Sequence, residues 1–175
     1  MPEPNAGRLR GLRQEDVAAC CAIAVRAWTP IHDILRKDYG EGLYRMALGG
    51  WEACKAAEVE DFCRRYPDNV VVSELRGEVV GFATFHVHAG GVIGVLGNNA
   101  VAPEHQGKGI GARQISHAVE ELTRRGVRYI EVITGLDQGH APALAMYEKL
   151  GFVQRRRTTL LYKEVGGDPT RTPRR

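Results

Sequence analysis

Three glycines occupy alternate positions, Gly107, Gly109 and Gly111, in the stretch EHQGKGIGAR. A β-type sequence precedes this stretch and a helical pattern follows it. Glycine in or beside a helix costs roughly 0.5–1 kcal/mol relative to alanine, so something must approach the backbone closely enough to offset that cost. The N–H groups at the start of a helix attract negative charge. The stretch therefore predicts a strand–loop–helix unit whose loop binds an anion.

Two well-known phosphate loops do not fit this stretch. The Walker pattern needs Gly-Lys followed by Ser or Thr, whereas Lys108 is followed by Gly109. The dinucleotide fingerprint needs G-x-G-x-x-G early in a βαβ unit, whereas here the spacing is G-x-G-x-G and a β-meander comes first. The anion site must therefore belong to another architecture.

The periodicity of the apolar residues predicts the order β-αα-βββ-α-β-α-β. Pro30 predicts a break between two helical regions, and Leu43, Met46, Ala47, Ala53 and Cys54 predict an inward stripe on the second. This order is typical of an α/β fold with one mixed sheet and helices on both faces. The expected strands are 8–12, the two arms of a hairpin over 69–88, 92–101, 127–134 and a last extended segment over 152–165. The expected helices are 15–28, 33–65, 110–125 and 141–150, and the second is expected to be interrupted near Gly40 and Gly49–Gly50.

The length of 175 residues suits one domain, which we expect over residues 8–165 between a flexible N-terminus (1–7) and a disordered basic tail (166–175). With 43% hydrophobic residues, the composition is that of a globular protein. The sequence contains no run of eighteen apolar residues, so it predicts no membrane-spanning helix, and the N-terminus has no signal-peptide core. The sequence therefore predicts a cytoplasmic protein without a membrane partner.

Charge and cysteine spacing exclude two further classes of site. The net charge is +3, and residues 166–175 carry three arginines and one aspartate, or +2, so the rest of the chain carries only +1. Such a low charge argues against a nucleic-acid partner. The four cysteines form no Cys-x-x-Cys pair, so we expect reduced thiols that pack as small apolar residues and no metal site.

The pattern Gln106-x-x-Gly109-x-Gly111, with NNAVAP before it and MYEKLGF after it, resembles the Gcn5-related N-acetyltransferase (GNAT) family. The resemblance implies the acyl-CoA N-acyltransferase fold and acetyl-CoA as the acetyl donor. It implies that the loop holds the pyrophosphate, and that the preceding strand, splayed from 128–134, holds the pantetheine arm. The implied cofactor-binding residues are Asn99, Ala100, Val101, Gln106, Gly107, Lys108, Gly109, Ile110, Gly111, Ala112 and His140.

Acetyl transfer to an amine needs a group that takes a proton from the amine and a group that protonates the departing thiolate. By the resemblance, Tyr147 is the general acid, since a phenol and a thiol have similar pKa values. Glu131, in the strand RYIEVIT, is the candidate base. A water held by Asn98 or Asn99 is the alternative. His86 and His88 titrate near neutral pH and are further candidates.

The acceptor is expected against the N-terminal helices and is a small-molecule amine or a peptide N-terminus. Trp28, Ile31, His32, Asp33 and Tyr39 supply an aromatic wall with one carboxylate there. A catalytically silent acyl-CoA sensor with the same fold is the alternative function. Because only one strand's worth of sequence follows Phe152, a second copy of the chain could complete the sheet edge, which favours a homodimer.

Overall fold

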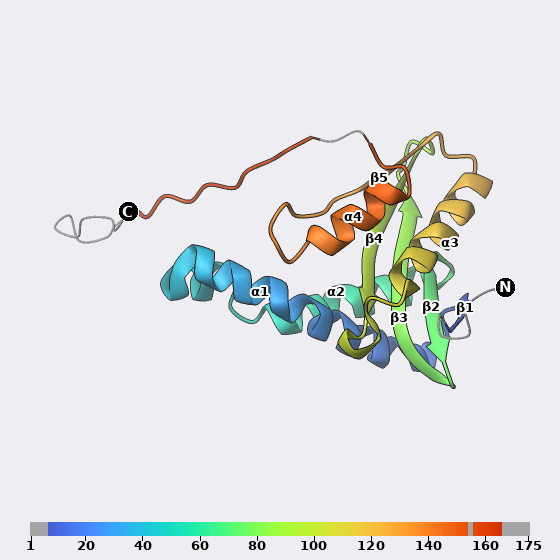
Figure 1. Cartoon of the computed structure of the whole chain (residues 1–175), viewed down its shortest axis with the longest axis horizontal. Helices are drawn as coiled ribbons and strands as arrows, with labels where there is room; N and C mark the ends of the chain where they lie inside the picture. Colours follow the sequence, from blue (N-terminus) through green and yellow to red (C-terminus); the bar gives the residue numbers. More distant parts are fainter. Residues whose placement is uncertain (1–6, 154–155, 166–175) are drawn as a thin grey trace.

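The computed structural model describes residues 7–153 and 156–165, and it contains one five-stranded sheet covered by helices (Figure 1). The strands lie in the order β1-β2-β3-β4-β5; each neighbouring pair is antiparallel except β4 and β5, which are parallel. The mixed sheet expected from the sequence is thus confirmed. The strands are β1 (Arg8–Gly11), β2 (Val70–Leu75), β3 (Glu78–Val87), β4 (Ile93–Val101) and β5 (Tyr129–Val132); the helices are α1 (Val17–Leu48), α2 (Trp51–Arg65), α3 (Ile110–Arg124) and α4 (Ala141–Lys149).

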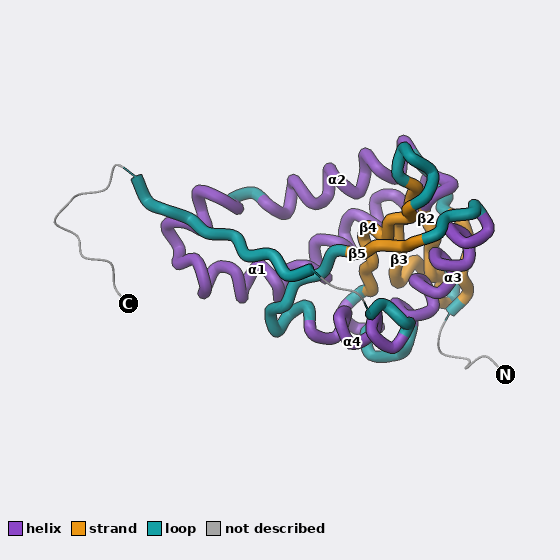
Figure 2. Tube along the Cα trace, turned by 90° about the horizontal axis from the view of Figure 1, so that it is seen from above, coloured by secondary structure: helices purple, strands orange, loops and turns teal. Residues whose placement is uncertain are grey.

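The two faces of the sheet carry two separate cores, because successive side chains of a strand point to opposite faces. Phe82 of β3 packs with residues of α1 and α2. Its neighbour Ala83 packs with residues of α3 and with Tyr147 of α4. The central strand β3 is therefore buried on both faces, with α1 and α2 on one side and α3 and α4 on the other (Figures 1 and 2).

The predicted break at Pro30 is wrong, since α1 continues through this residue. The carbonyl that a residue at this position would bond is that of Arg26, which lies on the exposed side of the helix, so water can satisfy it. The Thr29 hydroxyl donates to the Val25 carbonyl oxygen at 3.0 Å in the same turn. The interruption expected near Gly40 is confirmed, since its φ of 72° breaks the helical backbone there.

The inward stripe expected on the second helical region is also wrong. Met46 is 88% exposed, and Ala53 and Cys54 are exposed as well. The side chains that turn inward are Tyr44, Trp51, Val59 and Cys63. The kink at Gly40 and the turn at Gly49–Gly50 change which face of each helical piece meets the sheet. Apolar residues chosen by one helical period across these glycines therefore do not share one buried face.

The last strand is absent from the described residues after α4. Residues 152–153 and 156–165 have no ladder partner, and the segment 156–165 extends away from the sheet towards the far end of α1 (Figure 2). Tyr162 packs edge-on against Tyr39 of α1 with ring centroids 5.3 Å apart, while Leu160 and Leu161 stay exposed. Of the predicted tails, 1–7 and 166–175, all residues except Gly7 lie outside the described residues.

A buried ion-pair cluster joins β1, β2 and the start of α1. Arg10 binds both carboxylate oxygens of Asp16, at 2.6 and 3.0 Å, and its Nε donates to Glu74 at 2.6 Å. Asp16 is 4% exposed and also accepts the N–H of Arg13 at 2.7 Å. The hydrogen bond from Arg10 outweighs burial and holds the pKa of the Asp16 carboxyl below its usual range. The cluster therefore fixes the edge strand β1 to the body of the sheet.

Asp16→Asn should lower the free energy of unfolding by about 1.5–3 kcal/mol at pH 7, because it removes the charge-assisted hydrogen bonds to Asp16 and leaves Glu74 as the remaining carboxylate bonded to the buried Arg10. The folded-state pKa of Asp16 is depressed, so its contribution is present above the unfolded value of about 3.9 and is lost as pH falls through the folded value. Urea unfolding at pH 7 and in acid measures both effects. Asp61→Asn, which breaks an exposed pair with Arg65, is the control and should cost less than about 1 kcal/mol. Equal losses in the two variants would contradict this account.

Candidate active site at the bulge of strand β4

Strand β4 carries a β-bulge in the middle of the sheet. Ala83 faces Asn99 and Phe85 faces Leu96, so Thr84 alone opposes both Gly97 and Asn98. The Asn98 N–H donates to the Thr84 hydroxyl at 2.8 Å. A Cβ on Gly97 would lie 2.5 Å from the same hydroxyl oxygen, so glycine is required there. A tight local contact therefore fixes the position of the bulge.

The bulge coincides with the end of the β4–β5 ladder. The two strands pair from Ile93–Tyr129 to Leu96–Val132, and the described residues show no pairing between them beyond that point. The β5-facing backbone groups of 97–101 are therefore left without a strand partner. One of them, the Val101 carbonyl oxygen, accepts a bond from the Gln106 side chain at 3.0 Å. An extended ligand with amide groups could bind the others as an added strand would.

The two neighbouring asparagines after the bulge point to opposite faces of the sheet, as successive strand residues do. Asn98 contacts α2, where its amide donates to Glu58 Oε1 at 3.0 Å. Asn99 lies on the other face and makes a hydrogen bond with Tyr147 of α4. Its Oδ1 is buried and has no partner among the described residues. The unpaired stretch of β4 thus has distinct polar groups on each face.

Tyr147 is buried, at 6% exposure, and packs edge-on against Phe152 with ring centroids 5.7 Å apart. Burial raises the pKa of its phenol above the usual value, and the hydrogen bond with Asn99 opposes that shift only in part. The phenol is therefore fully protonated at neutral pH. It can donate a proton to a base formed beside it.

The glycine loop lies directly after β4 and ends at the first turn of α3. Gly107 and Gly109 have φ values of 73° and 74°, in the left-handed region that favours glycine. The Arg113 N–H bonds to the Gly109 carbonyl oxygen at 3.1 Å, so the N–H groups of 110–112 precede the hydrogen-bond ladder of the helix. A Cβ on Gly111 would lie 3.4 Å from Asn99 Nδ2, which brings this helix end next to Asn99. The loop, Asn99 and Tyr147 therefore follow one another along one face.

The remaining loop residues have separate roles. Lys108 turns back and donates from its ammonium to the Glu104 carbonyl oxygen at 2.9 Å. Ile110 is buried at 1% exposure and anchors the first turn of α3. Ala100 is also buried, on the α1/α2 face. Ala112 is partly buried in the first turn of α3.

His140 precedes the first residue of α4 and is tied to its own turn. Its Nδ1 lies 2.6 Å from Asp137 Oδ2, and Asp137 Oδ1 accepts the N–H groups of Gly139 and His140 at 2.9 and 3.2 Å. Burial raises the pKa of Asp137, but the bonds and charge of His140 outweigh it and hold that pKa below its usual range. Asp137 therefore orients the ring, and Nε2 of His140 is the atom left to meet a ligand.

Glu131 lies on the face covered by α2. Its carboxylate is 3.0 Å from Nε2 of His88, and the His88 and His86 rings are 5.9 Å apart. His86 in turn packs near Phe62 of α2, with centroids 6.1 Å apart. Glu131 pairs in register with Val95, one residue before the ladder ends. It is therefore on the same face as Asn98 and on the opposite face from Tyr147.

Two residues that sequence reasoning missed lie beside Asn98. Lys55 and Glu58 of α2 are an i, i+3 ion pair at 2.8 Å, and both bond to the Asn98 side chain. On a helix with many charged residues, such a pair looks like an ordinary surface contact. The only available signal was Asn98, because a polar residue inside a β-rich run needs a partner.

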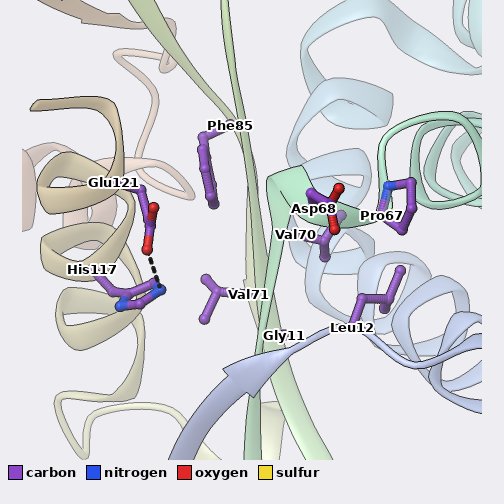
Figure 3. A pocket seen from close by; sticks show the side chains of 9 residues that line it. All are labelled: Gly11, Leu12, Pro67, Asp68, Val70, Val71, Phe85, His117 and Glu121. Carbon is purple, nitrogen blue, oxygen red and sulfur yellow. Dashed lines mark ion pairs between the residues drawn. The ribbon is translucent and has the colours of Figure 1, made fainter. Parts of the chain in front are cut away.

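A pocket among the described residues lies apart from these groups. It has a volume of about 340 Å³ and lies between α3 and the β1–β2 end of the sheet, where the His117–Glu121 ion pair borders it (Figure 3). It contains none of the site residues predicted from the sequence. Among the described residues, no group of three His, Cys, Asp or Glu side chains could hold a metal ion, and no helix is long and apolar enough to cross a membrane.

The fold agrees with comparisons to known proteins. Residues 28–152 match the Acetyltransferase (GNAT) family. This chain belongs to the GNAT family. A solved GNAT structure, the PaiA N-acetyltransferase of Thermoplasma acidophilum in complex with coenzyme A, superposes with a TM-score of 0.65 at 16% identity, over 86% of this chain and 92% of the other. At that identity the likeness establishes the fold alone.

Two sequence relatives of this GNAT chain act on different acceptors. An L-methionine sulfoximine/L-methionine sulfone acetyltransferase of Salmonella typhimurium is 33% identical over 90 residues, which are 50% of each chain. A ribosomal protein bS18-alanine N-acetyltransferase of Escherichia coli K12 is 41% identical over 59 residues, which are 33% of this chain and 37% of the other. The chain spans half or less of the length of the curated relatives it matches.

Gly109→Val should abolish binding of coenzyme A, because a branched side chain would occupy the space in front of the α3 N–H groups. Gly126→Val is the matched control, since Gly126 lies at the other end of α3 with a φ of 81° and equally open surroundings. Backbone strain is then similar in both variants, and only the first touches the loop. Isothermal titration with coenzyme A measures the difference, with circular dichroism as the folding check. Wild-type affinity in Gly109→Val would refute the loop assignment.

Proposed function

We propose that the chain is an N-acetyltransferase that moves the acetyl group of acetyl-CoA to a primary amine within a ternary complex. The observation that carries this proposal is the continuous path from the glycine loop, past Asn99, to the buried phenol of Tyr147. It joins an anion site to a proton donor beside an unpaired strand. Family membership supports the same reaction.

The residues present fit coenzyme A as the donor. Its pyrophosphate matches the loop, because Gly107 and Gly109 leave open space where a Cβ would stand and the helix end supplies N–H groups. Its pantetheine amides match the β5-facing backbone groups of Asn99 and Val101 and the unpartnered Oδ1 of Asn99. The backbone of Ala100 faces β3, so a contact of Ala100 with the ligand stays a prediction of the sequence. Gln106 and His140 are proposed to flank this path, with Lys108 at the outer rim of the loop.

The proposed step forms one bond and breaks another. The neutral amine nitrogen attacks the thioester carbonyl carbon, the C–N bond forms and the C–S bond breaks. The amine loses one proton, and the departing sulfur gains one from the Tyr147 hydroxyl. Burial keeps that hydroxyl protonated, so the group arrives in the state that the step requires.

For the amine proton we propose Glu131 as the acceptor, directly or through water. Its carboxylate lies on the α2 face, opposite Tyr147, so the two proton transfers occur on two sides of the sheet. The bond to His88 gives the proton a further route towards solvent. A water held by Asn98 or Asn99 is the competing route, with Glu131 then serving only to position His88.

The acceptor is proposed to be a small-molecule amine or a peptide N-terminus, as in the two relatives. His32, one of the residues expected at the acceptor site, stacks on Trp51 with centroids 3.7 Å apart and bonds to Tyr44 at 3.1 Å, two aromatic residues outside that prediction. A silent acyl-CoA sensor is the second candidate, but the buried proton donor favours the enzyme. The cytoplasmic location stays a prediction of the sequence.

We also propose a homodimer, because the outer edge of β5 is unpaired in the described residues and Ile133, just beyond it, is 92% exposed. The segment 156–165 presents exposed Leu160 and Leu161 and could pair with β5 of a second copy. Light scattering of the whole chain should give twice the chain mass. Leu160→Asp with Leu161→Asp should return it to the monomer, whereas a monomeric wild type would exclude this pairing.

Tyr147→Phe should lower kcat roughly 10²–10⁴-fold and leave the affinity for coenzyme A nearly unchanged, because only the proton donor is removed. The measurement is a turnover screen with acetyl-CoA against amines, polyamines, amino acids and N-terminal peptides. Transfer to any of them supports the enzyme, and binding without turnover would favour the sensor. An unchanged kcat in the variant, with chemistry rate-limiting, would remove Tyr147 from the mechanism.

Glu131→Gln should depress kcat/KM most at low pH, where the amine is almost wholly protonated and the wild type still has an ionised carboxylate. Raising the pH supplies neutral amine and should partly rescue the variant. The pH–rate profiles of variant and wild type are compared after a folding check. Parallel profiles would assign Glu131 a structural role and leave the water route as the mechanism.

A further inference from the structure

A small cage around one ammonium group lies at the bulge on the α2 face. The Lys55 Nζ lies 4.6 Å from the centroid of the Trp28 ring, 2.8 Å from Glu58 Oε2 and 3.3 Å from Asn98 Oδ1. The Lys55 side chain is only 16% exposed. An aromatic face, a carboxylate and an amide oxygen are the groups that recognise a cationic amine. The cage is therefore chemically suited to an ammonium of any origin.

The cage lies on the face of the sheet from which we expect the acceptor to approach the donor. Asn98 and Asn99 are neighbours at the end of the β4–β5 ladder, and they serve opposite faces of the sheet. The proposed donor path and Tyr147 lie on the Asn99 face. An amine that attacks a thioester held at the unpaired part of β4 therefore comes from the Asn98 face, where α2 supplies the cage.

The cage is also ordered in advance. Asn98 is only 8% exposed. Its backbone N–H donates to Thr84, and its side-chain amide donates to Glu58. The Glu58 carboxylate uses one oxygen for Asn98 and the other for Lys55. Burial raises the pKa of Glu58, and the bonds from Lys55 and Asn98 outweigh it, so that the pKa lies below its usual range and the carboxylate stays ionised.

We propose that this cage is the acceptor subsite, in which the protonated primary amine of the substrate takes the position of the Lys55 ammonium between Trp28, Glu58 and Asn98. Lys55 has a long flexible stem, so its ammonium can turn out to solvent while the charge balance of the site is kept. The proposal rests on the N-acetyltransferase function. Glu58 acts here as a binding group, and the proton of the bound ammonium still leaves by the route of Glu131 or of water.

The resident lysine indicates the class of acceptor. An amine on an unbranched alkyl chain, such as an alkylamine or the side chain of a lysine, reproduces the group that fills the cage. A free α-amino acid carries its own carboxylate next to the amine, which the Glu58 carboxylate repels. We therefore expect alkylamine-type acceptors to be preferred over free α-amino acids.

The test uses n-butylamine hydrochloride as the probe and the indole N–H signals of the two tryptophans as the readout, on the whole chain with saturating coenzyme A. The probe should shift the Trp28 signal and leave that of Trp51, which is stacked on His32, in place. Glu58→Gln should weaken the binding about 10–100-fold, because it removes a charge-assisted hydrogen bond. Lys55→Met, which removes the competing ammonium, should tighten it.

Glu60→Gln is the matched control, since Glu60 lies on the same helix but pairs with Arg64 at 2.6 Å and should bind the probe as wild type does. In turnover assays, Glu58→Gln should raise KM for the amine and leave KM for acetyl-CoA unchanged. A Trp28 signal that does not move, or that moves equally in Glu58→Gln, would overturn the subsite. Probe binding at Trp28 without acetylation of any amine would retain the ammonium site and refute the enzyme.

Discussion

One hydrogen bond, from the Asn98 N–H to the Thr84 hydroxyl, determines how the middle of this sheet is built. It fixes a bulge in which Thr84 opposes two residues, and Gly97 provides the space that the hydroxyl needs. The bulge changes the direction of β4, and the parallel ladder with β5 ends at the residue before it. The unpaired backbone of β4 begins at this contact, and the extra residue of the bulge sets which of the two asparagines faces α2.

The bulge gives each face of the sheet its own chemistry. On the side of α3 and α4, the glycine loop and Tyr147 lie beside Asn99, and this face combines the proposed anion site with a buried phenol. On the side of α1 and α2, Asn98 meets a carboxylate and an ammonium. A two-substrate reaction benefits from such a division, because donor and acceptor reach the reacting centre from opposite sides and do not compete for one pocket.

The sequence predicted those parts of the fold that depend on local periodicity and turn chemistry. The meander, the strand–loop–helix unit at Gly109 and the short helix around Tyr147 were all found near their expected bounds. Errors arose where a local rule was overridden. Pro30 is accommodated within α1 because the affected carbonyl faces solvent. The apolar residues predicted to line one face across Gly49–Gly50 do not do so, because the helix changes direction at these glycines. The predicted last strand is absent from the described residues, because a strand requires a hydrogen-bonded neighbour and the segment 156–165 extends away from β5.

The sequence by itself determined the strand–loop–helix unit with its alternate glycines and the order of the elements around it, and it predicted an anion site there because such glycines ahead of a helix have few other physical uses. Only the tertiary structure decided which polar groups meet. The partners of Asn98 are on α2, distant in the chain, and Lys55 and Glu58 follow the pattern of any charged helix surface. Likewise, the positions of Glu131 and Tyr147 on opposite faces depend on strand register and on the bulge. Periodicity assigns a side chain to a face of its own element, whereas a site is formed by faces of different elements that only packing brings together.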